Sequence, residues 1–151
     1  VFKNLDELNQ KESPRLKWGS KILKMMGVKV ISTKNTPKTI GPYSQAILSN
    51  NTLYCSGQIA LDPTSGVLVT NNIVDETNQV MKNILGLLKA ANMGFENVVK
   101  CTIFMKNMAD YKKINTVYSK YFNEAPPARE AVEVSVLPKN VNIEISVIAE
   151  Y

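Results

Sequence analysis

Two segments with helical periodicity stand among six short apolar segments, and this ratio constrains the fold more than any other feature of the chain. Apolar residues recur every three or four positions over residues 73–93 and again over residues 110–123, where Asp110 is a candidate cap. Alternating or β-branched runs, separated by turn-forming residues, predict the strands. These strands are expected at residues 28–33, 43–49, 52–57, 98–105, 131–137 and 142–151.

Two helices cannot cover both faces of a sheet of six strands. We therefore expect an α+β fold in which a mixed six-stranded sheet has both helices on one face. The other face is predicted to be apolar, since Val132, Val134, Val136 and Ile148 fall on it in the alternating pattern. An apolar sheet face without helices is usually buried by another subunit, so we expect an oligomer.

Length and composition fit one globular domain without a membrane span or a metal. The chain has 151 residues, 44% of them hydrophobic, and no apolar run approaches eighteen residues. Cys55 and Cys101 lie in apolar segments and are expected to be buried thiols rather than a disulfide. With two cysteines and no histidine, a zinc, iron or copper site is not expected, and neither is a cofactor. Because the two cysteines are expected to remain free thiols, we expect a reducing, cytoplasmic location.

The positive charge of the chain is concentrated at its N-terminus. Residues 1–29 contain seven lysines and arginines against three acids, whereas residues 30–151 contain eleven against ten. We expect an N-terminal extension over residues 1–28 and a domain over residues 29–151. A short basic amphipathic helix in the extension, serving a mitochondrial or plastid-like organelle, is the alternative to a loosely ordered tail. Because the domain is nearly neutral, nucleic acid is not its expected partner.

The second predicted helix combines lysines with aromatic residues. Such a mixture occurs in nucleic-acid grooves, but here the tyrosines are spaced as one face of a helix, which favours packing against the core. The residues are Tyr111, Tyr118 and Tyr121 beside Lys112, Lys113 and Lys120.

The absence of histidine also limits the chemistry. Histidine is the usual general acid–base near neutral pH, and most triads and metal-free ribonucleases depend on it. Any catalysis must use carboxylates, arginine, hydroxyls, backbone groups and water.

Arg129 is a candidate anion-binding residue. Only two of the eighteen basic residues are arginines, and lysine cannot replace arginine where a planar, two-pronged contact with a carboxylate or phosphate is needed. Arg129 follows Pro126 and Pro127 and precedes a predicted strand, so its backbone should be rigid. A structural salt bridge is the alternative role.

Several short motifs occur in one order along the chain. They are Ile-Gly-Pro-Tyr-Ser-Gln-Ala at residues 40–46, Ser-Gly-Gln-Ile at 56–59, Pro-Ala-Arg at 127–129, Leu-Pro-Lys at 137–139 and Ile-Glu-Ile at 143–145. With these motifs the chain resembles the reactive-intermediate deaminase family, also called RidA/YjgF, whose members have been labelled endoribonuclease L-PSP or translation inhibitor. The resemblance covers about residues 29–151.

The resemblance implies a chorismate-mutase-like fold in a homotrimer with clefts between subunits. It also implies hydrolysis of 2-aminoacrylate and 2-iminobutanoate, which are small 2-imino or enamine acids, to 2-keto acids and ammonia. Three residues match catalytic positions: Arg129 grips the substrate carboxylate, Glu144 is associated with the attacking water, and Tyr43 lines the cleft. The substrate-binding positions match Ser56, Gly57, Asn115 and Ala131.

Two positions depart from the family pattern. Glu130 follows the arginine where the family usually has a small or uncharged residue, and it would weaken substrate binding unless it points away. Ala131 stands where many relatives have cysteine, which leaves only a backbone role there. The alternatives to a deaminase are an endoribonuclease or translation inhibitor, which the missing histidine and the neutral domain disfavour, and a non-catalytic binder of small metabolites using the same cleft.

Overall fold

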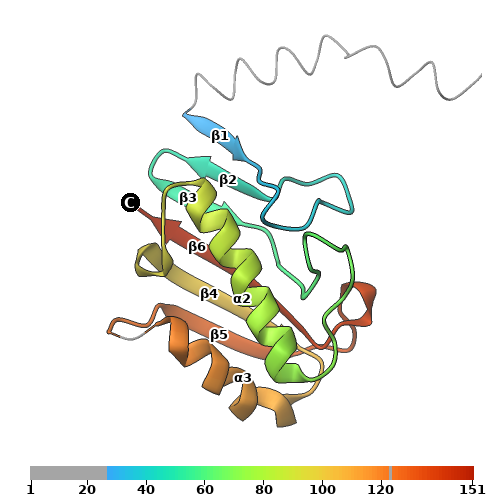
Figure 1. The fold of residues 1–151 in the computed structure, drawn as a ribbon. Helices are drawn as coiled ribbons and strands as arrows, with labels where there is room; N and C mark the ends of the chain where they lie inside the picture. Colours follow the sequence, from blue (N-terminus) through green and yellow to red (C-terminus); the bar gives the residue numbers. More distant parts are fainter. Residues whose placement is uncertain (1–26, 123) are drawn as a thin grey trace, which may run out of the picture.

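The computed structural model describes residues 27–122 and 124–151 (Figure 1). The predicted extension therefore lies outside the described residues except for its last two positions. Val28 is already the first residue of a strand. Within the described part of the chain, no helix is both long and apolar enough to cross a membrane.

A single mixed sheet of six strands forms the framework of the domain (Figure 1). Its spatial order is β1-β2-β3-β6-β4-β5. Neighbouring strands are antiparallel except for β4 and β5, which are parallel and have the connecting helix α3 between them in sequence. The strands are β1 (Val28–Ile31), β2 (Ala46–Ser49), β3 (Thr52–Cys55), β4 (Val98–Met105), β5 (Ala128–Glu133) and β6 (Ile143–Glu150).

Both helices, α2 (Ile73–Ala90) and α3 (Tyr111–Tyr118), lie on the same face of the sheet (Figure 1). The expected α+β architecture with one helix-covered face is thus confirmed. The apolar positions of α2 are buried against alternate residues of the central strands, so one core lies between the helices and the sheet. Its fully buried large residues include Leu53, Val80, Met81, Ile84, Leu87, Leu88, Ile103, Met105, Ile114, Ile143 and Ile145.

The ends of α2 follow from local chemistry. The Asn72 side chain accepts a hydrogen bond from the Asp75 backbone N–H at 3.0 Å, which satisfies one free donor of the first turn. The helix ends at Ala90, three residues before the predicted end, because Asn92 adopts a left-handed backbone conformation with φ 57°. Met93 then returns its N–H to the Leu88 carbonyl at 2.8 Å.

The start of the second helix differs from the prediction. Asp110 was the expected cap, but its side chain makes no capping hydrogen bond. Instead, Asn107 accepts from the Ala109 N–H at 2.9 Å and opens a 3-10 turn over Met108–Asp110, which leads into α3. A further 3-10 turn, Ser119–Tyr121, follows α3. Asn107 precedes the apolar pattern by too many residues for helical periodicity to reveal its role.

The fifth strand was predicted at residues 131–137, and this placement was wrong. β5 runs from Ala128 to Glu133 because it pairs with β4 from Lys100 to Met105, and it ends where its partner ends. Arg129 is therefore the second residue of a strand rather than part of the preceding loop. Val134 and Val136 lie beyond the strand, so they are not part of its face.

The face of the sheet opposite the helices, here called the open face, has no covering element in the described part of the chain. It contains Val132 and Ile148, as expected, with Val132 40% exposed. The strand register adds four further apolar residues to this face: Val30, Ile47, Tyr54 and Phe104.

The two cysteines have the predicted place in the core. Both are buried, free thiols on the helix-covered face. Burial raises the pKa of Cys55 to about 12 and also raises that of Cys101. Neither thiol is therefore suited to nucleophilic chemistry.

Candidate active site

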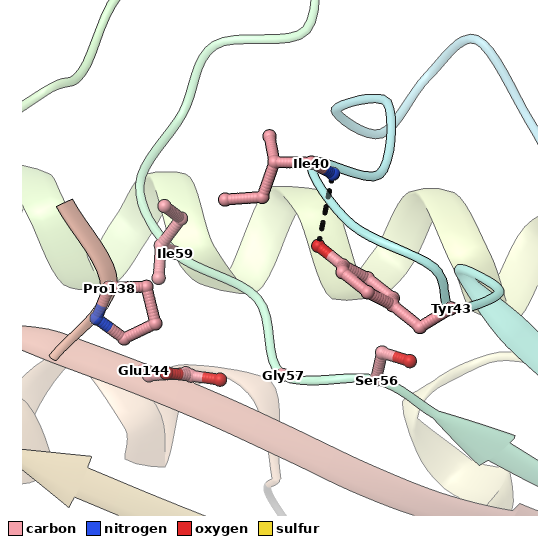
Figure 2. A pocket seen from close by; sticks show the side chains of 7 residues that line it. All are labelled: Ile40, Tyr43, Ser56, Gly57, Ile59, Pro138 and Glu144. Carbon is pink, nitrogen blue, oxygen red and sulfur yellow. Dashed lines mark hydrogen bonds between the residues drawn. The ribbon is translucent and has the colours of Figure 1, made fainter.

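Four of the seven predicted site residues surround one pocket beside the start of β6 (Figure 2). The pocket has a volume of about 350 Å³, enough for a small metabolite. Its lining residues are Ile40, Tyr43, Ser56, Gly57, Ile59, Pro138 and Glu144, here called the Glu144 pocket. Figure 2 shows the Glu144 and Ser56 side chains on either side of Gly57, with the Tyr43 ring above them in this view.

Tyr43 lies in the loop before β2, not in a strand as predicted. β2 begins at Ala46, and the buried Gln45 before it uses its side chain to organise the loop. The Gln45 side-chain oxygen accepts from the Thr33 N–H at 2.7 Å, and its amide donates to the Pro37 carbonyl at 2.8 Å. The half-exposed Tyr43 hydroxyl accepts from the Ile40 N–H at 3.4 Å, which places the ring over the pocket (Figure 2).

Gly57 allows the backbone after β3 to approach Glu144 closely. A Cβ atom at residue 57 would lie 1.8 Å from Glu144 Oε1, so any side chain there would displace the carboxylate. β3 ends at Cys55, and the backbone of Gln58 then bridges to Ile145 on β6. This arrangement lines up the backbone of residues 56–58 with the carboxylate.

Glu144 is half-buried, and burial raises the pKa of its carboxyl group above the usual value. In the described part of the chain, its carboxylate takes part in no hydrogen bond. A carboxyl group with a raised pKa and free oxygens is a better proton acceptor than an ordinary glutamate once it is ionised.

Two buried polar residues of α2 hold the pocket walls. Glu76 accepts hydrogen bonds from the backbone N–H and the side chain of Asn142 at 2.7 and 2.8 Å, which fixes the segment two residues before Glu144. Asn83 donates to the Ile59 carbonyl at 3.0 Å on another side of the pocket. Neither residue could be identified from the sequence, since polar side chains inside a helix give no signal of what they contact.

The other three predicted residues form a second group on the helix-covered face, here called the Arg129 cluster. Arg129 donates from Nη1 to Asn115 Oδ1 at 2.7 Å, so β5 and α3 together hold the guanidinium. Ala131 follows on the same face of β5 and packs against the core. The alternative role of Arg129, a structural salt bridge, is not found among the described residues, because Arg129 contacts no carboxylate there.

Two tyrosines missed as site residues also belong to the Arg129 cluster. Arg129 donates from Nη2 to the Tyr111 hydroxyl at 2.9 Å, and its guanidinium carbon lies 4.8 Å from the Tyr118 ring centroid and 5.6 Å from that of Tyr111. A hydrogen bond with Asn115 and the charge of Arg129 lower the pKa of Tyr111, whereas burial raises that of Tyr118. Their spacing with Asn115 on one face of α3 was the available signal.

Glu130 does not lie beside the Arg129 guanidinium. It points to the open face, where it accepts from the Thr102 hydroxyl at 2.6 Å and pairs with Lys100. The Lys100 and Thr102 contacts lower the pKa of Glu130, so its charge is engaged away from Arg129. The Glu130 carboxylate, which departs from the family pattern, therefore does not occupy the Arg129 guanidinium.

A single chain does not bring the predicted residues together. The Glu144 side chain is on the open face, since it alternates with the buried Ile143 and Ile145. Arg129 is on the other face, where it meets α3. The first group offers a proton-transferring carboxylate and the second offers a fixed, two-pronged cation, but the sheet lies between them.

Comparison with known proteins identifies the family. A family model described as endoribonuclease L-PSP matches residues 33–151. A RutC family protein of Pyrococcus horikoshii is 52% identical over 120 residues, which cover 80% of this chain and 95% of that protein. A 2-iminobutanoate/2-iminopropanoate deaminase of Mus musculus is 47% identical, over 80% of this chain and 90% of that protein.

A solved structure gives the same result for the fold. A protein of the conserved Rid family from Yersinia pestis has a TM-score of 0.80 and 48% identity, covering 82% of this chain and 99% of that one. The family model, the relatives and the fold agree with the motifs around Tyr43, Gly57, Arg129 and Glu144. The chain therefore belongs to the endoribonuclease L-PSP family, which is the RidA/YjgF family that its motifs resemble.

Proposed function

We propose that the protein hydrolyses small 2-imino acids, such as 2-iminobutanoate and 2-iminopropanoate, to 2-keto acids and ammonia. The observation that supports this proposal most is the set of contacts made by the Arg129 guanidinium. Its guanidinium is held by two hydrogen bonds and two aromatic rings without any carboxylate partner among the described residues. Such a group is suited to one small anion, and mammalian relatives of 46–47% identity have the deaminase name.

We infer that the active site is completed between subunits of a homotrimer. Arg129 and Glu144 belong to opposite faces of the sheet, so a substrate of a few atoms cannot reach both within one subunit. The apolar open face supports association, because such a face is normally covered. In the proposed trimer, the Arg129 cluster of one subunit faces the Glu144 pocket of the next.

The proposed reaction assigns one role to each group. Arg129 receives the substrate carboxylate in a two-pronged contact and so orients the imine carbon. Glu144 accepts a proton from water as the oxygen bonds to that carbon, and the proton passes to the nitrogen. The hydroxyl proton of the resulting intermediate follows the same route, the C–N bond breaks, and ammonia and the 2-keto acid leave. No oxidant or reductant enters this balance.

The test couples the purified protein to a threonine dehydratase, which releases the imine, and follows 2-oxobutanoate formation. We expect formation faster than in the dehydratase reaction alone, in proportion to the amount of protein added. Unchanged formation together with tight binding of 2-oxobutanoate would favour the non-catalytic binder. Cleavage of RNA by the same preparation, with no effect on the imine, would favour the ribonuclease alternative.

A further inference from the structure

Tyr111 lies at the outer end of the Arg129 cluster, where no motif had assigned it a role. It is the first residue of α3, and its side chain remains 37% exposed while bonding to the guanidinium. The other two tyrosines of the predicted aromatic face are more buried. Tyr118 is buried, and Tyr121 packs partly buried against the core. The Tyr118 ring also lies against the guanidinium, but Tyr111 combines partial exposure with a hydroxyl that bonds to Arg129.

The direction of its hydrogen bond is fixed by chemistry. A guanidinium has five N–H donors and no acceptor, so Arg129 donates and the phenol oxygen of Tyr111 accepts at 2.9 Å. Among the described residues the phenol donates its own O–H to no acceptor, so that hydrogen is available to a ligand. Asn115 engages the other arm of Arg129 at 2.7 Å, so the two terminal nitrogens are both oriented before a ligand binds.

We propose that Tyr111 is a further substrate-binding residue, whose hydroxyl holds one arm of Arg129 and donates its own hydrogen bond to the ligand carboxylate. The ligand class is a small 2-keto or 2-imino acid, and its identity rests on the proposed function. The carboxylate then meets guanidinium and phenol donors on adjacent groups. Preorganisation lowers the entropic cost of binding, and the additional donor strengthens it.

The electrostatic setting of the phenol agrees with this role. A hydrogen bond with Asn115 and the charge of Arg129 lower the pKa of Tyr111, so its O–H is a stronger donor than an ordinary phenol. The ring itself contributes a cation–π contact at 5.6 Å that would remain if the hydroxyl were removed. The hydroxyl can thus be tested separately from the ring.

The experiment compares Tyr111→Phe with the matched control Tyr121→Phe. In Tyr121→Phe only a 3.4 Å contact with Asn78 is lost, and Tyr121 takes no part in the contacts of Arg129. Calorimetric titration with 2-oxobutanoate should show a dissociation constant about tenfold higher for Tyr111→Phe and within twofold of the parent for Tyr121→Phe. With imine generated in situ, Tyr111→Phe should raise KM about tenfold and change kcat by less than threefold.

Each outcome decides the inference. A dissociation constant of Tyr111→Phe within twofold of the parent would overturn it, as would a fall in kcat with KM unchanged or a parent protein that does not bind 2-oxobutanoate. A parent that binds 2-oxobutanoate but does not accelerate imine hydrolysis would remove the proposed function. The titration would still test Tyr111 in that case, because it measures carboxylate binding alone.

Discussion

The guanidinium of Arg129 is oriented by its neighbours before any ligand arrives. Asn115 and Tyr111 accept from its two terminal nitrogens, and the Tyr118 ring lies 4.8 Å from its central carbon. These contacts fix a planar, two-pronged donor, which a lysine ammonium cannot reproduce. In the proposed carboxylate contact, Arg129 would therefore act through shape as much as through charge.

Replacing Arg129 with lysine should lower kcat/KM for 2-iminobutanoate by more than about a hundredfold, because a pair of charge-assisted hydrogen bonds is lost. Thermal unfolding should shift by about 4 °C or less, since the substitution removes only local contacts. The matched control is Arg15→Lys, the same change at the other arginine of the chain. Parent-like turnover by Arg129→Lys would contradict the clamp, and a loss of folding would support a structural role.

Glu144 should determine the acidic limit of activity. Its carboxylate must be ionised to accept a proton from water, and burial raises its pKa. Activity should therefore decline as the pH falls through a value above the ordinary glutamate range of about 4.3. Glu144→Gln should lower kcat by about 100-fold or more and remove this acidic limb from the pH–rate profile. If the acidic decline of the pH–rate profile were unchanged in Glu144→Gln, it would belong to another titrating group.

The same pKa shift has a consequence for stability. A carboxyl group whose pKa is raised in the folded state stabilises the fold below its unfolded pKa, and this contribution is lost as the pH rises through the folded pKa. Glu144→Gln carries no buried charge. Its stability relative to the parent should therefore increase between about pH 4 and neutral pH, as chemical denaturation at several pH values would measure. A constant difference across that range would contradict the assignment.

At the scale of elements, the chain segment leaving β3 and the start of β6 come together at Gly57. The Gln58–Ile145 bridge sets their separation, and the missing side chain at residue 57 leaves room for the Glu144 carboxylate. The loop of Tyr43 is attached to this region through the Ser56 hydroxyl, which donates to the Ser44 carbonyl at 2.7 Å. The pocket is thus formed by backbone approach.

Gly57→Ala should displace the Glu144 carboxylate, since the new methyl group would overlap it. We expect kcat to fall about as far as in Glu144→Gln, with binding of 2-oxobutanoate changed less than tenfold. The double variant Gly57→Ala/Glu144→Gln is the control, because two changes that act through one group are not additive. If the loss of kcat in the double variant equalled the product of the two single losses, Gly57 would act independently of Glu144.

At the scale of the whole molecule, the open face and the separation of the two site groups have one common explanation. A second subunit over the open face would bury residues such as Tyr54, which is 50% exposed, and Val132. The same contact could supply the missing half of the site. Association and activity should therefore be lost together.

Light scattering should give a mass about three times the 16.8 kDa of one chain. Val132→Glu should dissociate this assembly and abolish imine hydrolysis, although Val132 belongs to neither site group. The control Val67→Glu places the same charge at an exposed turn residue and should leave both unchanged. A monomeric parent, or an active monomeric Val132→Glu, would contradict the shared site.

The sequence by itself determined the element order, the two helices and the core, because helical and strand periodicities are local. It also singled out Arg129 as a candidate anion-binding residue, since scarcity of arginine and two preceding prolines are visible without a structure. It misplaced β5 and the cap of α3. The limits of β5 are set by its parallel partner β4, and the cap is Asn107, whose position has no hydrophobic period.

Only the tertiary structure decided how the site residues are distributed. Strand alternation shows which neighbours share a sheet face with Arg129 or with Glu144. It does not show which face the helices cover, and this decides that the two residues lie on opposite faces. Long-range contacts also decided that Tyr111 bonds to Arg129 while Tyr118 is buried, and that Glu130 pairs with Lys100. The physical reason is that these contacts join residues far apart in the chain, and a one-dimensional pattern does not record their partners.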